Sequence, residues 1–154
     1  MGERPLTAAS DGRVRQRDLD LRPRTRPADL FEVAPGLLVV QHAGGGKANQ
    51  YFLRGFDADH GTDVLLSVDG VPFNNVSHGH GQGYADPHFI IPELIEQVVV
   101  REGPYHAEDG DFATAGAVDL RYLTRVRESS LSLQGGRYGH ARLLGIARTE
   151  TGRL

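Results

Sequence analysis

The segment 63–73 constrains the fold of this chain more than any other part of the sequence. It places two runs of strand-forming residues on either side of Asp69 and Gly70, a pair that tolerates the positive φ angles of a tight two-residue turn. The first run, residues 64–68, is apolar apart from one serine, which is typical of a strand covered on both faces. The segment therefore predicts a β-hairpin whose first arm lies inside a larger sheet.

Short elements of both kinds are expected around this hairpin. Residues 25–34 predict a helix, because Pro27 favours a first helical turn and Asp29 lies near its positive end. Further strands are expected at 37–41, 50–54, 97–102 and 113–122, with a helical turn at 92–96 and long loops at 42–49 and 74–91. Residues 1–24 lack a lasting periodicity and are expected to form an extended lead-in. The sequence thus predicts an α+β domain over residues 25–122.

The last part of the chain, residues 123–154, has a different pattern. Residues 130–134 alternate polar and apolar side chains, a glycine-rich turn follows, and residues 140–148 run back. This pattern predicts a hairpin with one apolar and one polar face. Because an isolated two-stranded hairpin is marginal in water, we expect it to belong to a larger sheet.

Composition excludes several classes of protein. The chain has no cysteine, so disulfides, thiolate metal sites and thiol nucleophiles are excluded. Its net charge is −3, and although residues 121–154 are basic, they have few of the interleaved aromatic side chains of a nucleic-acid-binding surface. No nucleic-acid partner is therefore expected. Residues 1–10 lack the apolar segment of a signal peptide, so no export signal is expected in this chain.

Histidines provide the main candidate for a metal site. His78, His80 and His88 lie close together in a glycine-rich loop that also contains Asp86, and imidazole suits zinc, copper or iron. The alternative is a polar loop whose histidines bond to their neighbours, since the helix-spaced or cysteine-paired ligands typical of structural zinc are missing. A soluble metal- or ligand-binding module that uses these three histidines is kept as a second hypothesis.

Other motifs that carry chemistry are incomplete. Asp57 and Asp59 lack the further oxygen ligands of a calcium loop. The glycines before Lys47 lack the spacing of a phosphate-binding loop, and no serine lies in the frame of a nucleophile elbow. The chain is therefore not expected to be an enzyme or to need a cofactor.

Three blocks of sequence follow one another in a recognisable order. They are residues 29–37, residues 52–72 with Arg54-Gly-Phe and Asp69-Gly-Val-Pro, and residues 95–120 with Glu102-Gly-Pro. Together they resemble the plug domain of TonB-dependent outer-membrane receptors. The resemblance implies a gate: a plug with a small mixed β-sheet and short helices that fills a barrel of roughly 22 strands.

The resemblance also implies a location and partners. The full-length parent would lie in the outer membrane of a Gram-negative bacterium and take up a scarce small-molecule ligand, such as an iron chelate, cobalamin or a sugar. Its partners would be its own β-barrel and the TonB energy-transducing complex, which remodels the plug. Residues 123–154 fall where such receptors begin the barrel, so the chain is expected to be a fragment that cannot form a pore alone. Residues 1–18 contain no convincing TonB box.

Two sets of site residues follow from the resemblance. The loops at 42–49 and 74–88 are expected to face the ligand. Their candidate residues are His42, Lys47, Asn49, Asn74, His78, His80, Gln82, Tyr84 and His88.

The second set consists of plug–barrel contacts. Plugs of this family often carry a basic residue in the Arg-Gly-Phe block and another just before Gly-Pro, both facing acidic residues of the barrel. Arg54 matches the first position, but Glu102 occupies the second. Arg101 does not replace that charge, because adjacent strand residues point to opposite faces. We therefore expect an altered charge arrangement involving Arg54, Arg101 and Glu102.

Overall fold

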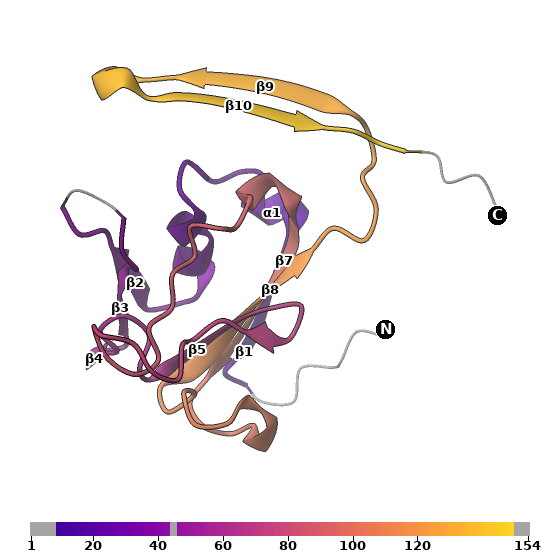
Figure 1. Cartoon of the computed structure of the whole chain (residues 1–154). Helices are drawn as coiled ribbons and strands as arrows, with labels where there is room; N and C mark the ends of the chain where they lie inside the picture. The colour runs from indigo at the N-terminus through magenta and orange to yellow at the C-terminus, as the bar shows by residue number, and fades with distance from the viewer. Residues whose placement is uncertain (1–8, 44–45, 150–154) are drawn as a thin grey trace. The chain divides into compact units, whose positions relative to one another are not determined.

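The computed structural model describes residues 9–43 and 46–149 (Figure 1). The chain divides into two compact units, one ending at Tyr122 and one beginning at Leu123. Within the described residues, no helix is both long enough and apolar enough to span a membrane.

The first unit alternates short strands with short helices, of which all but α1 are 3₁₀ helices (η). In chain order the elements are β1 (Asp11–Arg15), α1 (Gln16–Leu19), η1 (Pro27–Val33), β2 (Leu37–Val40), β3 (Gln50–Leu53), β4 (Phe56–Asp57), β5 (Val64–Val68), β6 (Val71–Pro72), η2 (Pro92–Leu94), β7 (Ile95–Glu102), η3 (Ala107–Asp109) and β8 (Gly116–Tyr122). The predicted α+β class is confirmed.

The larger sheet has the strand order β1-β7-β8-β5-β6. Its strands pair antiparallel except β5 and β8, which run parallel, so the sheet is mixed. Alternate residues of β5, β7 and β8 point into the core, among them the fully buried Val64, Val98 and Leu120. The hairpin at 63–73 is confirmed: Asp69 and Gly70 both have positive φ angles, 51° and 78°, as a primed turn requires.

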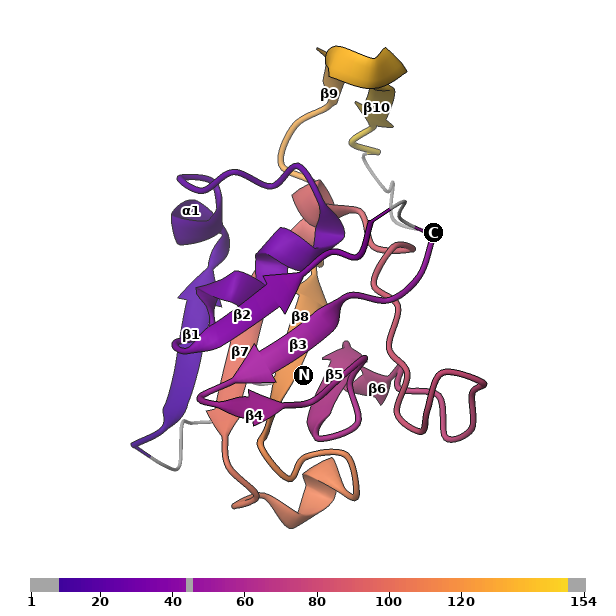
Figure 2. The same ribbon diagram turned by 90° about the vertical axis from the view of Figure 1, so that its left-hand side faces the viewer.

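A second sheet, β2-β3-β4, packs on the inner face of the first (Figure 2). The predicted helix at 25–34 forms as η1, and its Phe31 lies edge-on to Tyr51 of β3 with ring centroids 6.0 Å apart. Both side chains are fully buried in one cluster with the inward residues of the larger sheet. The core therefore lies between the two sheets and η1.

The expectation of an extended lead-in over residues 1–24 needs correction. Residues 1–8 lie outside the described residues, but 11–15 form the edge strand β1, paired antiparallel with β7, and α1 follows directly. Leu19 is 1% exposed and belongs to the core. An edge strand held by backbone pairing needs little apolar alternation of its own, which is why the sequence pattern did not indicate it.

The second unit is a hairpin of β9 (Ser130–Gly135) and β10 (Ala141–Ile146), joined through η4 (Arg137–Gly139). One face is apolar, as predicted: Leu133 pairs with Leu143, and their exposed fractions are 80% and 68%. The opposite face is mixed rather than polar, because Leu144 lies there beside serine, glutamine and arginine side chains.

Candidate functional site

Five aromatic rings from three separate segments form one group around His60 and Tyr84. His42 follows β2, His60 lies in the turn between β4 and β5, and His78, His80 and Tyr84 belong to the loop between β6 and η2. The ring centroid of His60 lies 5.0 Å from that of His42, 5.7 Å from His80 and 5.4 Å from Tyr84. We call these five residues the ring cluster.

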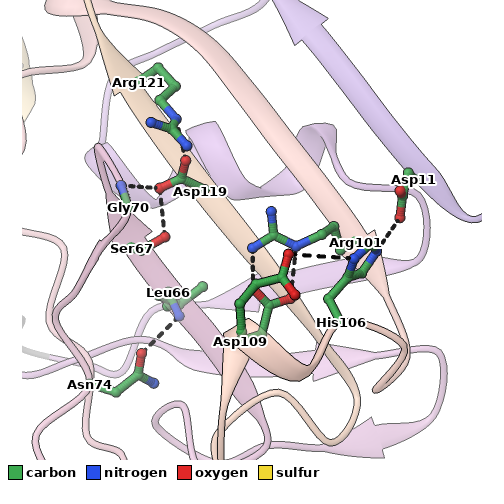
Figure 3. Close-up of polar contacts among 11 residues, drawn as sticks. Asp11, Leu66, Ser67, Gly70, Asn74, Arg101, His106, Asp109, Asp119 and Arg121 are labelled. Carbon is green, nitrogen blue, oxygen red and sulfur yellow. Dashed lines mark hydrogen bonds and ion pairs between the residues drawn. The ribbon is translucent and has the colours of Figure 1, made fainter. Parts of the chain in front are cut away.

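Hydrogen bonds of Asn74 hold the loop that supplies three of these rings. The buried Asn74 side chain accepts from the Leu66 N–H at 2.8 Å (Figure 3). Its amide nitrogen lies within 3.0 Å of the carbonyl oxygens of Gly61, Val64 and Gly83. Because the bonds fix both the start and the end of the loop, they define where the rings lie.

Tyr84 connects the two loops that were expected to face a ligand. Its hydroxyl accepts a hydrogen bond from the Ala48 N–H at 2.7 Å, and its ring stacks on His78 with centroids 3.8 Å apart. The backbone of Asn75 pairs with that of Tyr84. The loops at 42–49 and 74–88 are therefore parts of one local structure.

Two backbone carbonyl groups hold the side chain of His60 in the ring cluster. Its side chain is 10% exposed, and its Nδ1 lies 3.1 Å from the carbonyl oxygen of Ala48 and 3.2 Å from that of Asn49. A carbonyl oxygen only accepts hydrogen bonds, so Nδ1 carries the proton and donates. In the neutral ring, Nε2 then has a free lone pair.

The structure separates the predicted ligand-facing residues into groups. His42, His78, His80 and Tyr84 come together in the ring cluster. Asn49 and Asn74 are buried at 1% and 8% exposure, so they are anchors of the loops. Lys47, Gln82 and His88 have no ring contact with the cluster within the described residues. His88 instead bonds to Asp86.

The hypothesis of a metal site built from His78, His80 and His88 is not supported. Among residues 9–43 and 46–149, no three or more His, Cys, Asp or Glu side chains converge so as to hold a metal ion. The reason is local: His78 Nδ1 accepts from the His80 N–H at 3.2 Å, while His88 is engaged with Asp86. His60 was not among the predicted site residues, because its only signal in the sequence is its place beside Asp59.

A second group of charged residues lies where β7 ends beside β1 (Figure 3). Arg101 forms two hydrogen bonds to the carboxylate of Asp109, and His106 Nε2 lies 3.1 Å from Asp11 of β1. Both carboxylates are 4% exposed. These contacts fix the loop after β7 to β1.

Glu102 is paired inside the first unit. Its carboxylate, 7% exposed, lies 2.5 Å from the guanidinium of Arg54, which is 60% exposed. Arg101 and Glu102 point to opposite faces of β7, as the strand geometry predicted, and each has its own partner. Cavities of about 550 Å³ and 400 Å³ both border the Arg54–Glu102 pair. The expectation that these charges contact a barrel stays a prediction.

The pKa of Tyr51 is strongly shifted. Tyr51 is fully buried and donates its hydroxyl hydrogen to the Ala85 carbonyl at 3.1 Å. Burial raises the pKa of Tyr51 far above its ordinary value, and the charges of Asp86 and Tyr84 raise this pKa further. The Tyr51 hydroxyl therefore stays protonated and holds the loop that ends at Ala85.

Comparison with known proteins agrees with this architecture. Residues 6–117 match the family model described as TonB-dependent Receptor Plug Domain. The chain is 31% identical over 130 residues to the vitamin B12 transporter BtuB of Vibrio vulnificus, a match that covers 83% of this chain and 20% of that protein.

Solved structures with the same fold include two siderophore receptors and a copper transporter. A variant of the ferric enterobactin receptor PfeA from Pseudomonas aeruginosa matches 82% of this chain and 19% of its own, with a TM-score of 0.61 at 22% identity. PirA from Acinetobacter baumannii matches 81% and 19%, with a TM-score of 0.58 at 24% identity. The copper transporter OprC matches 91% and 21%, with a TM-score of 0.62 at 20% identity. The chain spans about a fifth of the length of each of these proteins.

Proposed function

Because this chain belongs to the TonB-dependent receptor plug domain family, we propose that it gates a β-barrel transporter in the outer membrane of a Gram-negative bacterium. Residues 11–122 act as the plug, and residues 123–154 begin the barrel. The gate opens when the TonB complex remodels the plug. The family consists of receptors and transporters, so no catalytic role is assigned.

The observation that carries the proposal is the two-sheet α+β unit, which shares its fold with receptor plugs at TM-scores near 0.6. The outer face of the larger sheet also suits this role. Paired residues lie on the same side of a sheet, so Asp11, Arg101, Asp119 and Arg121 share that face. Asp11 and Asp119 are only 4% and 2% exposed there, and Leu65 and Ala117 lie on the same face, so the face is mixed. Charged groups on such a face are expected where a plug meets the polar interior of a barrel.

The hairpin β9–β10 supports the assignment of the last residues. Strands of a membrane barrel alternate apolar residues toward lipid with other residues toward the interior. Leu131, Leu133 and Leu143 lie on one face and are each at least 68% exposed. Such a face needs an apolar environment, which lipid around a barrel would supply.

The proposed ligand is a scarce small molecule that binds above the plug, in the class of iron chelates, cobalamin and sugars. The ring cluster and the segment around His88 form the plug's share of that binding surface. Relatives named for vitamin B12 and ferric enterobactin lie within this range of ligands, and a structural neighbour named as a copper transporter lies outside it. The barrel would supply the rest of the surface.

A chimeric transporter tests the gating role. The full 154-residue chain replaces the matching first fifth of the Vibrio vulnificus vitamin B12 transporter, and single-channel conductance is measured in planar bilayers. We expect the chimera to conduct as little as the intact transporter and far less than a version without its plug. A chimera that assembles its barrel but conducts like the plugless version would refute the proposal.

A further inference from the structure

The side-chain contacts around β1 are concentrated at the two ends of the segment that contains it. At the start, Ser10 Oγ donates a hydrogen bond to the carbonyl oxygen of Glu102 at 3.2 Å. Next to it, the carboxylate of Asp11 lies 3.1 Å from Nε2 of His106 (Figure 3). At the far end, Leu19 of α1 is 1% exposed and packs in the core.

Between these ends, β1 buries little apolar surface. Gly12 has no side chain, Arg13 and Arg15 are charged, and Val14 is only partly buried against the core. The backbone of β1 pairs with β7 on one side alone, because β1 is the edge strand of the larger sheet (Figure 2). Segments with few buried apolar contacts open at a lower free energy than the core of a protein. We therefore expect β1 to open more easily than the central strand β8.

The contact of Asp11 lies where it resists this opening. Asp11 is the first residue of β1 and pairs in register with Arg101. Its carboxylate is 4% exposed and the His106 side chain 14% exposed, so the contact is shielded from solvent. His106 belongs to the loop after β7, which a hydrogen bond between Arg101 and Asp109 holds against β7. Detachment of β1 from its start therefore has to break the contacts of Ser10 and Asp11 before the remaining backbone pairs separate.

The start of β1 also forms part of the wall of two cavities. Residues 9–10 line the cavity of about 550 Å³, and residues 9–12 line the cavity of about 400 Å³. The ion pair of Arg54 and Glu102 borders both of them. Detachment of β1 would remove this part of the wall and open both cavities on the side of the ion pair.

We propose that residues 9–15, which we call the edge segment, detach from β7 as a local unit whose release is controlled by the Asp11–His106 and Ser10–Glu102 contacts. Leu19 stays in the core when the edge segment opens, and β7 keeps its pairing with β8. The rest of the first unit therefore stays folded while both cavities open. That this opening is a step in the remodelling by the TonB complex rests on the proposed function, whereas the detachment itself does not.

Hydrogen exchange of the full 154-residue chain tests the inference. Amide exchange is followed by mass spectrometry at pH 7 in peptides that cover β1, β5 and β8. After correction for intrinsic rates, we expect the protected amides of β1 to exchange at least about tenfold faster than those of β8, through a local opening. Urea below the unfolding transition should change exchange in β1 less than in β8, because a local opening exposes little surface.

Two variants separate release of the edge segment from overall stability. Asp11→Ala and His106→Gln each remove one partner of the shielded contact, and each should raise exchange in β1 about five- to tenfold. Exchange in β8 and the near-ultraviolet circular dichroism of the tyrosines should stay those of the parent. His88→Gln is the matched control, because His88 contacts Asp86 in the same way in a different loop.

Three results would overturn the inference. The amides of β1 could exchange as slowly as those of β8, or as fast as unprotected amides, so that no controlled local opening exists. The variants at Asp11 and His106 could raise exchange in β1 and β8 equally, or no more than His88→Gln does. Because the exchange measurement involves no barrel, its failure leaves the gating proposal intact, and a failed chimera leaves the exchange result intact.

Discussion

Removing the Arg54 side chain should destabilise the first unit by leaving the Glu102 carboxylate buried without its cation. Breaking a fully buried ion pair from one side costs about 3–5 kcal/mol, whereas exposed pairs contribute about 0.2–1 kcal/mol. Glu102 is 7% exposed but Arg54 is 60% exposed, so solvent screens one side of the pair. We expect Arg54→Ala to lower the free energy of unfolding by about 1–3 kcal/mol.

Two further variants isolate the charge effect. Arg54 has φ of 49°, a region in which glycine avoids a strain of about 1 kcal/mol, so Arg54→Gly should lose less stability than Arg54→Ala. The double variant Arg54→Ala, Glu102→Gln removes the unpaired charge and should recover part of the loss. Urea denaturation of the full chain at pH 7, followed by circular dichroism and tyrosine fluorescence, measures all of them. The reasoning fails if Arg54→Ala stays within about 0.5 kcal/mol of the parent, or if the double variant is no more stable than Arg54→Ala.

Substitutions at three further positions, Asn74, Tyr51 and Gly116, test the packing of the first unit. Asn74→Ala should lower the free energy of unfolding by roughly 2–4 kcal/mol, since it leaves a β5 N–H and several carbonyls unpaired. Asn74→Asp, which keeps only the acceptor, should also be destabilised. Full stability of either variant in urea denaturation would contradict the anchoring role. Tyr51→Phe should cost about 0.5–1.5 kcal/mol at pH 7. Because the folded-state pKa of Tyr51 is raised, the stability that its hydroxyl contributes is complete below the unfolded pKa of about 10 and is lost as pH rises above that value. Melting temperatures from pH 8 to 11 should therefore fall less steeply in Tyr51→Phe than in the parent. Gly116→Ala would place Cβ 2.5 Å from the Arg101 carbonyl oxygen, whereas a Cβ at Gly110 would face open space. We therefore expect the free energy of unfolding to fall by at least about 2 kcal/mol in Gly116→Ala and by about 1 kcal/mol in Gly110→Ala. Equal losses in the two variants would exclude the steric explanation.

Residue types within a single segment were enough to predict the hairpin at 63–73 and the helix at 25–34. The turn at Asp69 and Gly70 is set by two residues that accept positive φ angles, and η1 begins at Pro27. β1 could not be predicted in this way, because its stability comes from backbone pairing with β7, more than eighty residues later.

The candidate site was also only partly predictable from the sequence. The sequence indicated that the histidine-rich loops matter, but polarity alone could not distinguish an exposed contact residue from an anchor such as Asn74. The roles of Asn74 and His60 depend on carbonyl groups brought near them by the fold. His60 lies in a short aspartate-rich turn, and only its approach to His42 and His80 sets it apart.

The position of β8 has a consequence for biosynthesis. β8 is the middle strand of the larger sheet but the last of its five to leave the ribosome. A nascent chain that ends before Gly116 lacks the strand that joins β7 to β5, so its apolar sheet faces stay uncovered. Assembly then waits for nearly the whole unit to be synthesised, and contacts between distant segments form slowly. During that interval the protein would depend on chaperones to prevent aggregation.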